Sequence, residues 1–175
     1  GVSLVSYTGA QKFFNFASKA NFSFSQVNSE LLVLLNDDME GISSEWLGAL
    51  IEFAQSPEIG TVGGKLLHAN GTIQHVGVVA GVNNGCAHLY HGHPRDTIGY
   101  NGYTHLILNY ATLTGACLAT RKSVIEEVGG FDEVFAIDYN DTDFCLSALE
   151  NGYRNVYTPY CCLLYTSDAA DESLC

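Results

Sequence analysis

The chain has 175 residues, and its 7 Lys+Arg against 19 Asp+Glu give a formal net charge of -12. Hydrophobic residues make up 47% of the chain and charged residues 15%, which excludes a disordered polymer and favours one folded domain. The scarcity of basic side chains argues against a nucleic-acid-binding protein, because few groups are available to neutralise phosphates.

The sequence contains no segment with the length of a membrane-spanning helix. The aliphatic run at residues 31–35 is far shorter than the roughly 20 apolar residues that such a helix needs, and no signal sequence precedes it. The six cysteines lack the paired spacing of a metal site or a disulfide framework. We therefore expect Cys117 and Cys145 to be small core residues in a reducing compartment, with a disulfide as the less favoured alternative.

Helix and strand patterns alternate in the first part of the chain. Residues 11–20 predict a short helix, and the continuous apolar run at 31–35 is typical of a strand buried on both faces. Apolar side chains then recur at helical spacing up to Pro57, after an N-cap at Ser43 or Ser44. A strand followed by an amphipathic helix is typical of α/β proteins.

The middle of the chain favours strands. Residues 60–67 and 72–80 predict two strands that pair through a turn at Asn70-Gly71. Residues 81–105 are rich in Gly, Asn and His and show no periodicity, so they predict a long loop of the kind that is usually functional or mobile. Strand character returns over residues 106–119.

Two helices and a strand complete the prediction. A short helix at residues 124–128 ends at Gly129-Gly130, and a longer one from Asn140 to Leu149 stops before Gly152. Residues 156–159 predict the final strand. The pattern contains no internal repeat and no second domain.

A first acidic cluster, Asn36-Asp37-Asp38, directly follows the predicted buried strand at residues 31–35. Ligands bind outside the carboxyl ends of strands in open α/β sheets, and adjacent carboxylates there suit Mg²⁺ or Mn²⁺. The alternative is a turn that caps the next helix. The motif alone leaves both interpretations equally open.

A second acidic cluster, residues 140–143, opens the last predicted helix. Negative charge at a helix N-terminus is stabilising by about 0.3–1 kcal/mol, so a purely structural role is one interpretation. The surrounding segment is nevertheless strongly acidic and has no basic residue between Lys122 and Arg154. A carboxylate in this cluster is expected to have a raised pKa, as a general base would, but the spacing does not say which one.

Histidines offer a competing metal site. His88, His91 and His93, with His105 further on, have the spacing of a loop ligand set, and imidazoles suit zinc. We regard zinc as the less favoured alternative, because no Cys or carboxylate stands at a fixed spacing beside them.

Seven sequence blocks occur in a characteristic order. They are residues 31–40 (LLVLLNDDME), 64–68 (GKLLH), 71–75 (GTIQH), 114–118 (TGACL), 128–133 (VGGFDE), 139–145 (YNDTDFC) and 152–159. Together they resemble the family 2 glycosyltransferases of the GT-A fold, and most of all the bacterial rhamnosyltransferase and O-antigen type. The resemblance covers about residues 13–160.

The resemblance implies an α/β fold of the GT-A type, with a Rossmann-like, mostly parallel sheet flanked by helices. The N-terminal nucleotide-binding strand of the family is missing, so we expect residues 1–160 to be a partial GT-A domain and the chain to be a fragment with little or no activity. Residues 161–175 do not fit the family pattern. They look like translated adapter sequence, and we expect a non-native or disordered tail there.

The family transfers a sugar from a nucleotide-diphosphate donor to an acceptor hydroxyl, usually with inversion, and its bacterial members of this type build cell-surface polysaccharide. By resemblance, Asp38 ligates the divalent ion, Mn²⁺ or Mg²⁺, that bridges the donor diphosphate. Asn36 is the second candidate metal ligand, and both Asn36 and Asp37 are candidate donor-binding residues.

The same resemblance places Asp141 at the position of the catalytic base, where it takes the proton of the acceptor hydroxyl. Gly115 and Ala116 are implied to border the donor sugar, with Gly115 allowing close backbone approach. Residues 81–105 are then an acceptor-side loop.

The implied partners are a nucleotide-diphosphate sugar and a glycan or lipid-linked acceptor. We expect a cytoplasmic location, at the inner face of the membrane where the parent protein associates with it peripherally. Two alternatives stay open from the residues: a metal-dependent hydrolase or phosphatase that uses the same carboxylates with the histidines, and a noncatalytic glycan-binding module.

Overall fold

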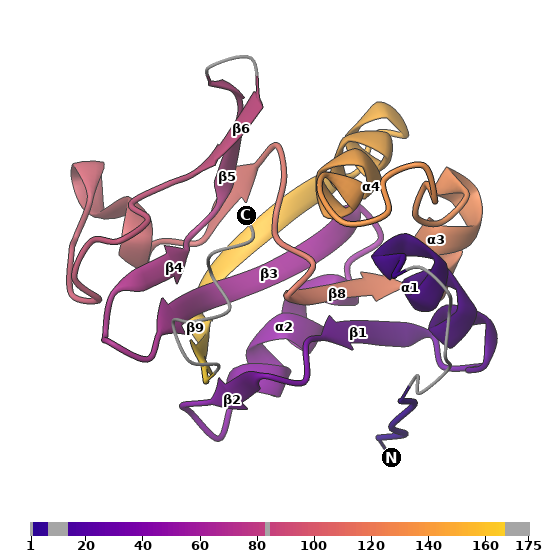
Figure 1. The fold of residues 1–175 in the computed structure, drawn as a ribbon, viewed down its shortest axis with the longest axis horizontal. Coiled ribbons are helices and arrows are strands. Elements are labelled where there is room, and N and C mark those ends of the chain that lie inside the picture. The colour runs from indigo at the N-terminus through magenta and orange to yellow at the C-terminus, as the bar shows by residue number, and fades with distance from the viewer. Residues whose placement is uncertain (1, 7–13, 83–84, 167–175) are drawn as a thin grey trace.

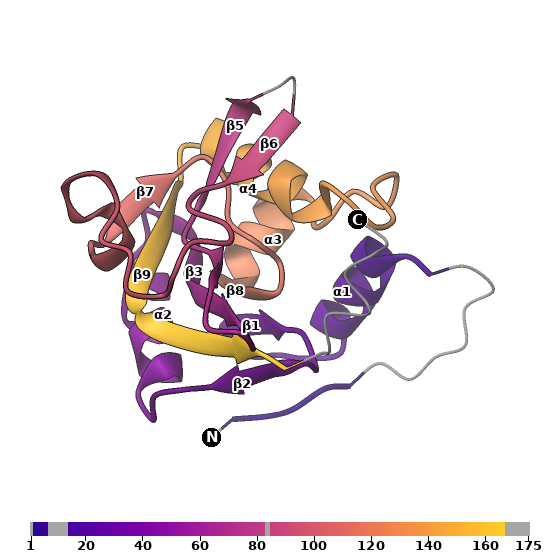
Figure 2. The same cartoon turned by 60° about the vertical axis from the view of Figure 1, so that its left-hand side comes forward.

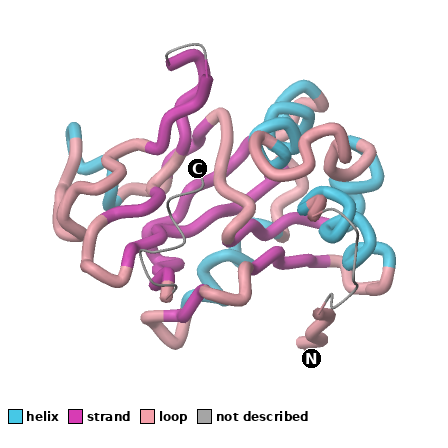
Figure 3. The backbone as a smooth tube through the Cα atoms, viewed as in Figure 1, coloured by secondary structure: helices cyan, strands magenta, loops and turns pink. Residues whose placement is uncertain are grey.

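A computed structural model describes residues 2–6, 14–82 and 85–166. Within these ranges, a seven-stranded sheet runs through the middle of the molecule, and three of the four described α-helices lie beside one another at one side of it (Figures 1 and 3). The elements in chain order are α1 (Phe16–Ser25), β1 (Leu31–Leu35), β2 (Met39–Gly41), α2 (Trp46–Ala54), β3 (Ile59–His68), β4 (Ile73–His75), β5 (Val78–Val82), β6 (Gly85–His88), the 3₁₀ helix η1 (Tyr100–His105), β7 (Leu108–Tyr110), β8 (Cys117–Arg121), α3 (Lys122–Val128), α4 (Asn140–Glu150) and β9 (Arg154–Tyr165).

The strand order is β1-β8-β3-β9-β2, with β4 added to β3 and β7 added to β9. β8 is antiparallel to both β1 and β3, whereas β9 is parallel to β3. The main strands β1, β3 and β9 therefore all run in one direction, and in this sense the predicted Rossmann-like, mostly parallel α/β sheet is confirmed. The pairing of adjacent strands is nevertheless mixed parallel and antiparallel, because β8 runs in the opposite direction between β1 and β3. The short strands β2, β4 and β7 are also antiparallel to their partners.

The sheet separates two hydrophobic cores. α2 packs on one face, and α1, α3 and α4 pack on the other (Figure 2). Successive side chains of a strand point to opposite faces, so Leu66 of β3 joins the α2 core while the adjacent Leu67 joins the core of the other three helices. Cys117 and Cys145 are both buried and unbridged, as predicted.

The predicted hairpin at Asn70-Gly71 is present, but the predicted strand at 72–80 is divided. Only β4 pairs with β3, and the chain then bends at Gly77, with φ +114°, into β5. β5 and β6 form a separate two-stranded sheet. β6 and η1 thus occupy parts of the segment 81–105 that was predicted to be a loop. β6 pairs with the preceding strand β5, and the Thr104 side chain of η1 donates to the carbonyls of Thr97 and Ile98.

The predicted strand at 106–119 is also two strands. β7 pairs with β9 and β8 pairs with β1 and β3, so the chain crosses β3 between them. Gly63 marks the crossing, because a Cβ there would lie 3.3 Å from the side chain of Leu113. The apolar pattern is continuous through the crossing, so the sequence does not reveal the break.

The helices follow their predicted positions with small shifts. The predicted helix at 11–20 begins later, where the Asn15 side chain caps α1 by accepting from the Ser18 backbone N–H at 2.9 Å; residues 11–13 lie outside the described residues. Neither predicted serine caps α2, and α3 ends at Gly129 in the left-handed conformation, as predicted. None of the helices in the described ranges combines the length and apolar character needed to span a membrane.

β9 is much longer than the predicted strand at 156–159, and it includes the first five residues of the segment that was predicted to be a non-native or disordered tail. Residues 161–165 are not a disordered tail, because they pair with β3 on one side and β2 on the other, and Cys161 and Leu163 are fully buried. Residues 167–175 lie outside the described part. The non-native origin of 161–175 stays a prediction, which a genomic read across Tyr160 tests.

The bend at Gly77 yields a stability prediction. A Cβ at this position would lie 2.3 Å from the ring of Tyr110, and the backbone has a positive φ. Gly77→Ala is therefore expected to lower the free energy of unfolding by about 3 kcal/mol in urea denaturation. The control is Gly81→Ala. Gly81 also has a positive φ, but no other atom lies within 4 Å of the position that its Cβ would take, so this substitution is expected to lower the free energy of unfolding by about 1 kcal/mol. Equal losses would contradict the role of the Tyr110 contact.

Candidate active site

The first acidic cluster lies where the sequence predicted, in the turn at the carboxyl end of β1. Leu35, the last residue of that strand, pairs with Cys117 at the start of β8. The ladder continues one step further, since the Asn36 backbone N–H donates to the carbonyl of Ala116 at 3.0 Å. The turn is therefore fixed to the segment that precedes β8.

The three side chains of this turn differ in their surroundings. Asp37 is exposed, whereas Asn36 and Asp38 are half-buried. The Oδ1 atom of Asp38 is inaccessible to solvent and has no hydrogen-bond partner among the described residues. A buried carboxylate oxygen without a donor is costly unless a cation or a hydrogen bond compensates it. Asp38 therefore fits a hard divalent cation better than either neighbour does.

Asp141, which the family resemblance singled out, lies in the first turn of α4. Its Oδ2 atom accepts a hydrogen bond from the Gly115 backbone N–H at 2.7 Å, and its Oδ1 atom accepts one from the N–H of Thr142, also at 2.7 Å. The side chain is half-buried. Two backbone donors thus orient the carboxylate and leave it reachable from solvent.

Gly115 and Ala116 join the two acidic clusters. The carbonyl of Ala116 holds the turn after β1, and the N–H of Gly115 holds Asp141. A Cβ on Gly115 would lie 3.3 Å from the Cβ of Asp141 and 3.5 Å from the ring of Phe16, so glycine permits this close approach. Residues that are far apart in the sequence therefore meet at one end of the β1–β8 pair.

The raised pKa expected in the second acidic cluster belongs to Asp143. Burial raises the pKa of this carboxyl, and the negative charges of Asp132 and Glu150 raise it further. The N-cap residue of α4 is Tyr139, and the Asn140 side chain donates to the carbonyl of Ile137 at 2.6 Å.

Two histidines lie against each other, and the sequence identified only one of them as a candidate. The Nδ1 atoms of His75 in β4 and His88 in β6 are 3.0 Å apart. His75 is fully buried, and burial, followed by the influence of His88, holds its pKa well below the usual range. Burial also lowers the pKa of His88, whereas the charge of Asp141 raises it.

The environment of His75 determines its tautomer. Its Nε2 atom is buried and has no partner among the described residues, so a proton there would be an unpaired donor. The proton is therefore best placed on Nδ1, which donates to Nδ1 of His88. No sequence signal indicates this pairing, because it depends on a strand and a hairpin that meet only in the folded chain.

The alternative zinc set does not form. The rings of His88 and His91 lie edge to face with centroids 6.3 Å apart, and Nδ1 of His91 lies 3.1 Å from the carbonyl of Gln74. The ring of His93 instead lies edge-on to Tyr90. Over the described ranges, no group of three or more His, Cys, Asp or Glu side chains has a metal-binding arrangement.

Comparison with known sequences places the chain among glycosyltransferases. The family described as Glycosyl transferase family group 2 matches residues 49–170. The chain is 37% identical over 158 residues to the O-antigen biosynthesis protein RfbC of Myxococcus xanthus, covering 90% of this chain and 12% of that protein. It is 35% identical over 158 residues to Uncharacterized protein y4gI of Sinorhizobium fredii (strain NBRC 101917 / NGR234), covering 90% of this chain and 17% of that protein.

Two solved structures share the fold. Mannosyltransferase PcManGT from Pyrobaculum calidifontis, in complex with GDP-Man and Mn²⁺, matches with a TM-score of 0.58 and 16% identity, covering 95% of this chain and 40% of that one. GalNAc-T7 with UDP, GalNAc and Mn²⁺ matches with a TM-score of 0.66 and 9% identity, covering 86% and 30%. The predicted GT-A fold is confirmed.

The buried histidine predicts how stability depends on pH. Unfolded His75 takes up a proton below a pH of about 6.5, whereas the folded protein resists this protonation, so the free energy of unfolding should fall as the pH drops from 7 to 5. His75→Gln is expected to make this fall shallower by up to about 1.4 kcal/mol per pH unit. The control, Gln74→Leu, changes the neighbouring residue of β4, which does not titrate, and should keep the wild-type slope. Identical slopes in all three proteins would rule out a buried neutral His75.

Proposed function

Because the chain belongs to glycosyl transferase family group 2, we propose that it transfers a sugar from a nucleoside-diphosphate sugar to an acceptor hydroxyl, with inversion at the anomeric carbon. The observation that carries this proposal is the junction at Gly115 and Ala116, which brings the Asp38 turn and Asp141 to the same end of the sheet. This arrangement supplies a place for a leaving diphosphate and a base for an incoming alcohol. The hydrolase and glycan-binding alternatives are not favoured by the family.

Asp141 is the proposed catalytic base. The acceptor oxygen forms a bond to the anomeric carbon while the bond from that carbon to the diphosphate oxygen breaks, and the hydroxyl proton passes to the Asp141 carboxylate. The hydrogen bonds from the N–H groups of Gly115 and Thr142 hold the carboxylate in one orientation during this transfer. Gly115 and Ala116 border the donor sugar in this proposal.

Asp38 is the proposed ligand of a divalent cation, Mn²⁺ or Mg²⁺, with Asn36 as a second oxygen ligand. The unpartnered, buried Oδ1 atom of Asp38 supports this assignment, as does the Mn²⁺ named in both structural relatives. When bound, such a cation neutralises the negative charge that develops on the departing diphosphate. Asp37, which is exposed, is left to contact the donor nucleotide.

The proposed partners follow from the relatives' names. The structural relatives contain GDP-Man, or UDP with GalNAc, and RfbC is named for O-antigen biosynthesis. We propose a nucleotide-sugar donor, a glycan or lipid-linked acceptor in cell-surface polysaccharide synthesis, and a cytoplasmic site of action at the inner membrane face. The chain spans less than a fifth of either relative's length.

The metal assignment is tested by Mn²⁺ binding in the presence of UDP or GDP, followed by the electron paramagnetic resonance signal of free Mn²⁺. Asp38→Asn is expected to weaken Mn²⁺ binding at least about tenfold, because it removes the charge of the main oxygen ligand. Asp96→Asn, which removes a carboxylate that is 94% exposed, serves as the control and should bind as the wild type does. Equal affinity in all three proteins would reject Asp38 as the ligand.

The base assignment is tested by sugar transfer from a panel of nucleotide sugars that includes GDP-mannose and UDP-GalNAc. The assay uses this chain and, in parallel, the longer protein that the fragment interpretation predicts. Asp141→Asn is expected to lower kcat by about 10²–10⁴ with little change in donor affinity, because the amide cannot accept the hydroxyl proton. Asp143→Asn is the matched control. A kcat that falls more in the Asp143 variant would move the base to that residue.

A further inference from the structure

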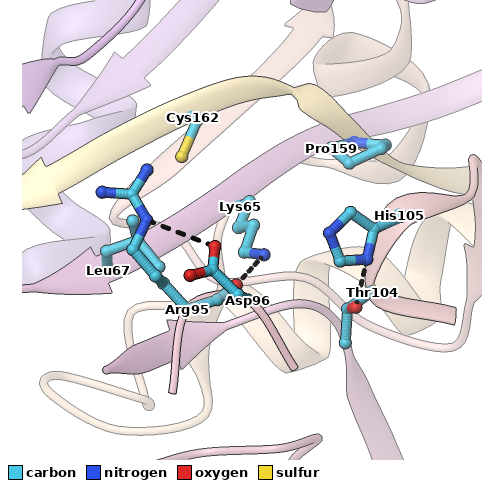
Figure 4. A pocket seen from close by; sticks show the side chains of 8 residues that line it. All are labelled: Lys65, Leu67, Arg95, Asp96, Thr104, His105, Pro159 and Cys162. Atoms are coloured by element: carbon cyan, nitrogen blue, oxygen red, sulfur yellow. Dashed lines mark hydrogen bonds and ion pairs between the residues drawn. The ribbon is translucent and has the colours of Figure 1, made fainter. Parts of the chain in front are cut away.

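A second site gathers basic side chains in a cavity that neither Asp38 nor Asp141 lines (Figure 4). Its volume is about 180 Å³. Lys65 comes from β3, Arg95 from the loop before η1, and His105 from the end of η1. Two of the seven Lys+Arg residues of a chain with net charge -12 thus line one cavity, together with one carboxylate, that of Asp96, which lies between them in Figure 4.

Lys65 is a buried cation whose charge is only partly compensated. Its residue is 7% exposed, and its Nζ atom donates to the carbonyl of Arg95 at 2.7 Å. No carboxylate in the described part of the chain forms an ion pair with it. Burial lowers the pKa of Lys65 and the charge of Arg95 lowers it further, although Cys162 and Asp96 oppose this. An anion in the cavity would supply the missing counter-charge.

Arg95 leaves most of its guanidinium available. Its one ion pair among the described residues joins Nε to Asp96 at 3.9 Å, and both side chains are largely exposed, at 53% and 94%. Such a long surface pair contributes little. The terminal nitrogens of Arg95 remain as a planar fork, which suits the oxygens of a phosphate group.

His105 adds a third group with a defined proton. The Oγ1 atom of the buried Thr104 donates its single hydrogen to the carbonyls of Thr97 and Ile98, at 2.5 and 2.9 Å. It must therefore accept from Nδ1 of His105, 2.8 Å away. Figure 4 shows the other ring nitrogen of His105 on the side that faces Lys65.

We propose that this cavity binds a phosphate group whose oxygens accept from Lys65 and Arg95 and whose remaining O–H donates to the unprotonated ring nitrogen of His105. Its volume of about 180 Å³ is below the roughly 300–1,000 Å³ of pockets that enclose drug-sized ligands, so it suits a phosphate group rather than a whole nucleotide sugar. The phosphate is either the free ion or a monoester on a larger molecule. The site shares no residue with the proposed catalytic groups, so the two proposals stand or fall separately.

The test is calorimetric titration of the intact chain with inorganic phosphate and with glycerol 3-phosphate, without divalent metal or nucleotide. Lys65→Met and Arg95→Gln are each expected to weaken phosphate binding at least about tenfold, since each removes a charge-assisted contact. Arg154→Gln is the matched control, because Arg154 is 52% exposed and also has one weak acidic partner, Glu58. It should bind phosphate as the wild type does.

The outcomes separate the sources of the phosphate. Binding of both ligands supports a site that accepts esterified phosphate, and binding of inorganic phosphate alone supports a site for the free ion. Arg95 lies at the surface, so its variant keeps the test valid even if Lys65→Met fails to fold. Undiminished binding by Arg95→Gln, or an absence of saturable binding of either ligand to the wild type, overturns the proposal.

Discussion

Two backbone hydrogen bonds from adjacent residues organise the functional end of this domain. The carbonyl of Ala116 accepts from Asn36, and the N–H of Gly115 donates to Asp141. Gly115 and Ala116 form the turn that leads directly into the β1–β8 ladder, so their backbone groups place the two acidic segments more rigidly than contacts between two side chains would. The site therefore depends on the register of β1 against β8, and a slip of one residue would turn the flanking side chains to the other face of the sheet.

Three basic side chains in the described part of this acidic chain, Lys65, Arg121 and Lys122, donate to backbone carbonyl groups. Arg121 donates to the carbonyls of Ala54 and Pro57 at the end of α2, and Lys122 donates to the carbonyl of Val27. The C-terminal end of a helix carries partial negative charge, so a buried arginine is well placed there. Lys65 shares this pattern but lies in a cavity with Arg95. For that reason its surroundings, unlike those of Arg121, leave room for an external anion.

Local chemistry explains which elements the sequence predicts well. α2 and α4 have apolar periodicity, α3 ends at a left-handed Gly129, and the β3–β4 hairpin turns at a left-handed Gly71. These features depend on residues a few positions apart. The division of the 72–80 strand at Gly77 depends instead on the ring of Tyr110, which belongs to a distant strand. The length of β9 likewise depends on partners in β3 and β2.

The sequence by itself determined the family, the α/β class and the two acidic segments, because motif order, periodicity and charge are properties of the linear chain. Only the tertiary structure decided that Asp38 has a buried oxygen without a partner among the described residues, and that His75 lies against His88. It also decided that Lys65, Arg95 and His105 surround one cavity. These facts depend on burial and on contacts between segments far apart in the chain, which no local pattern encodes.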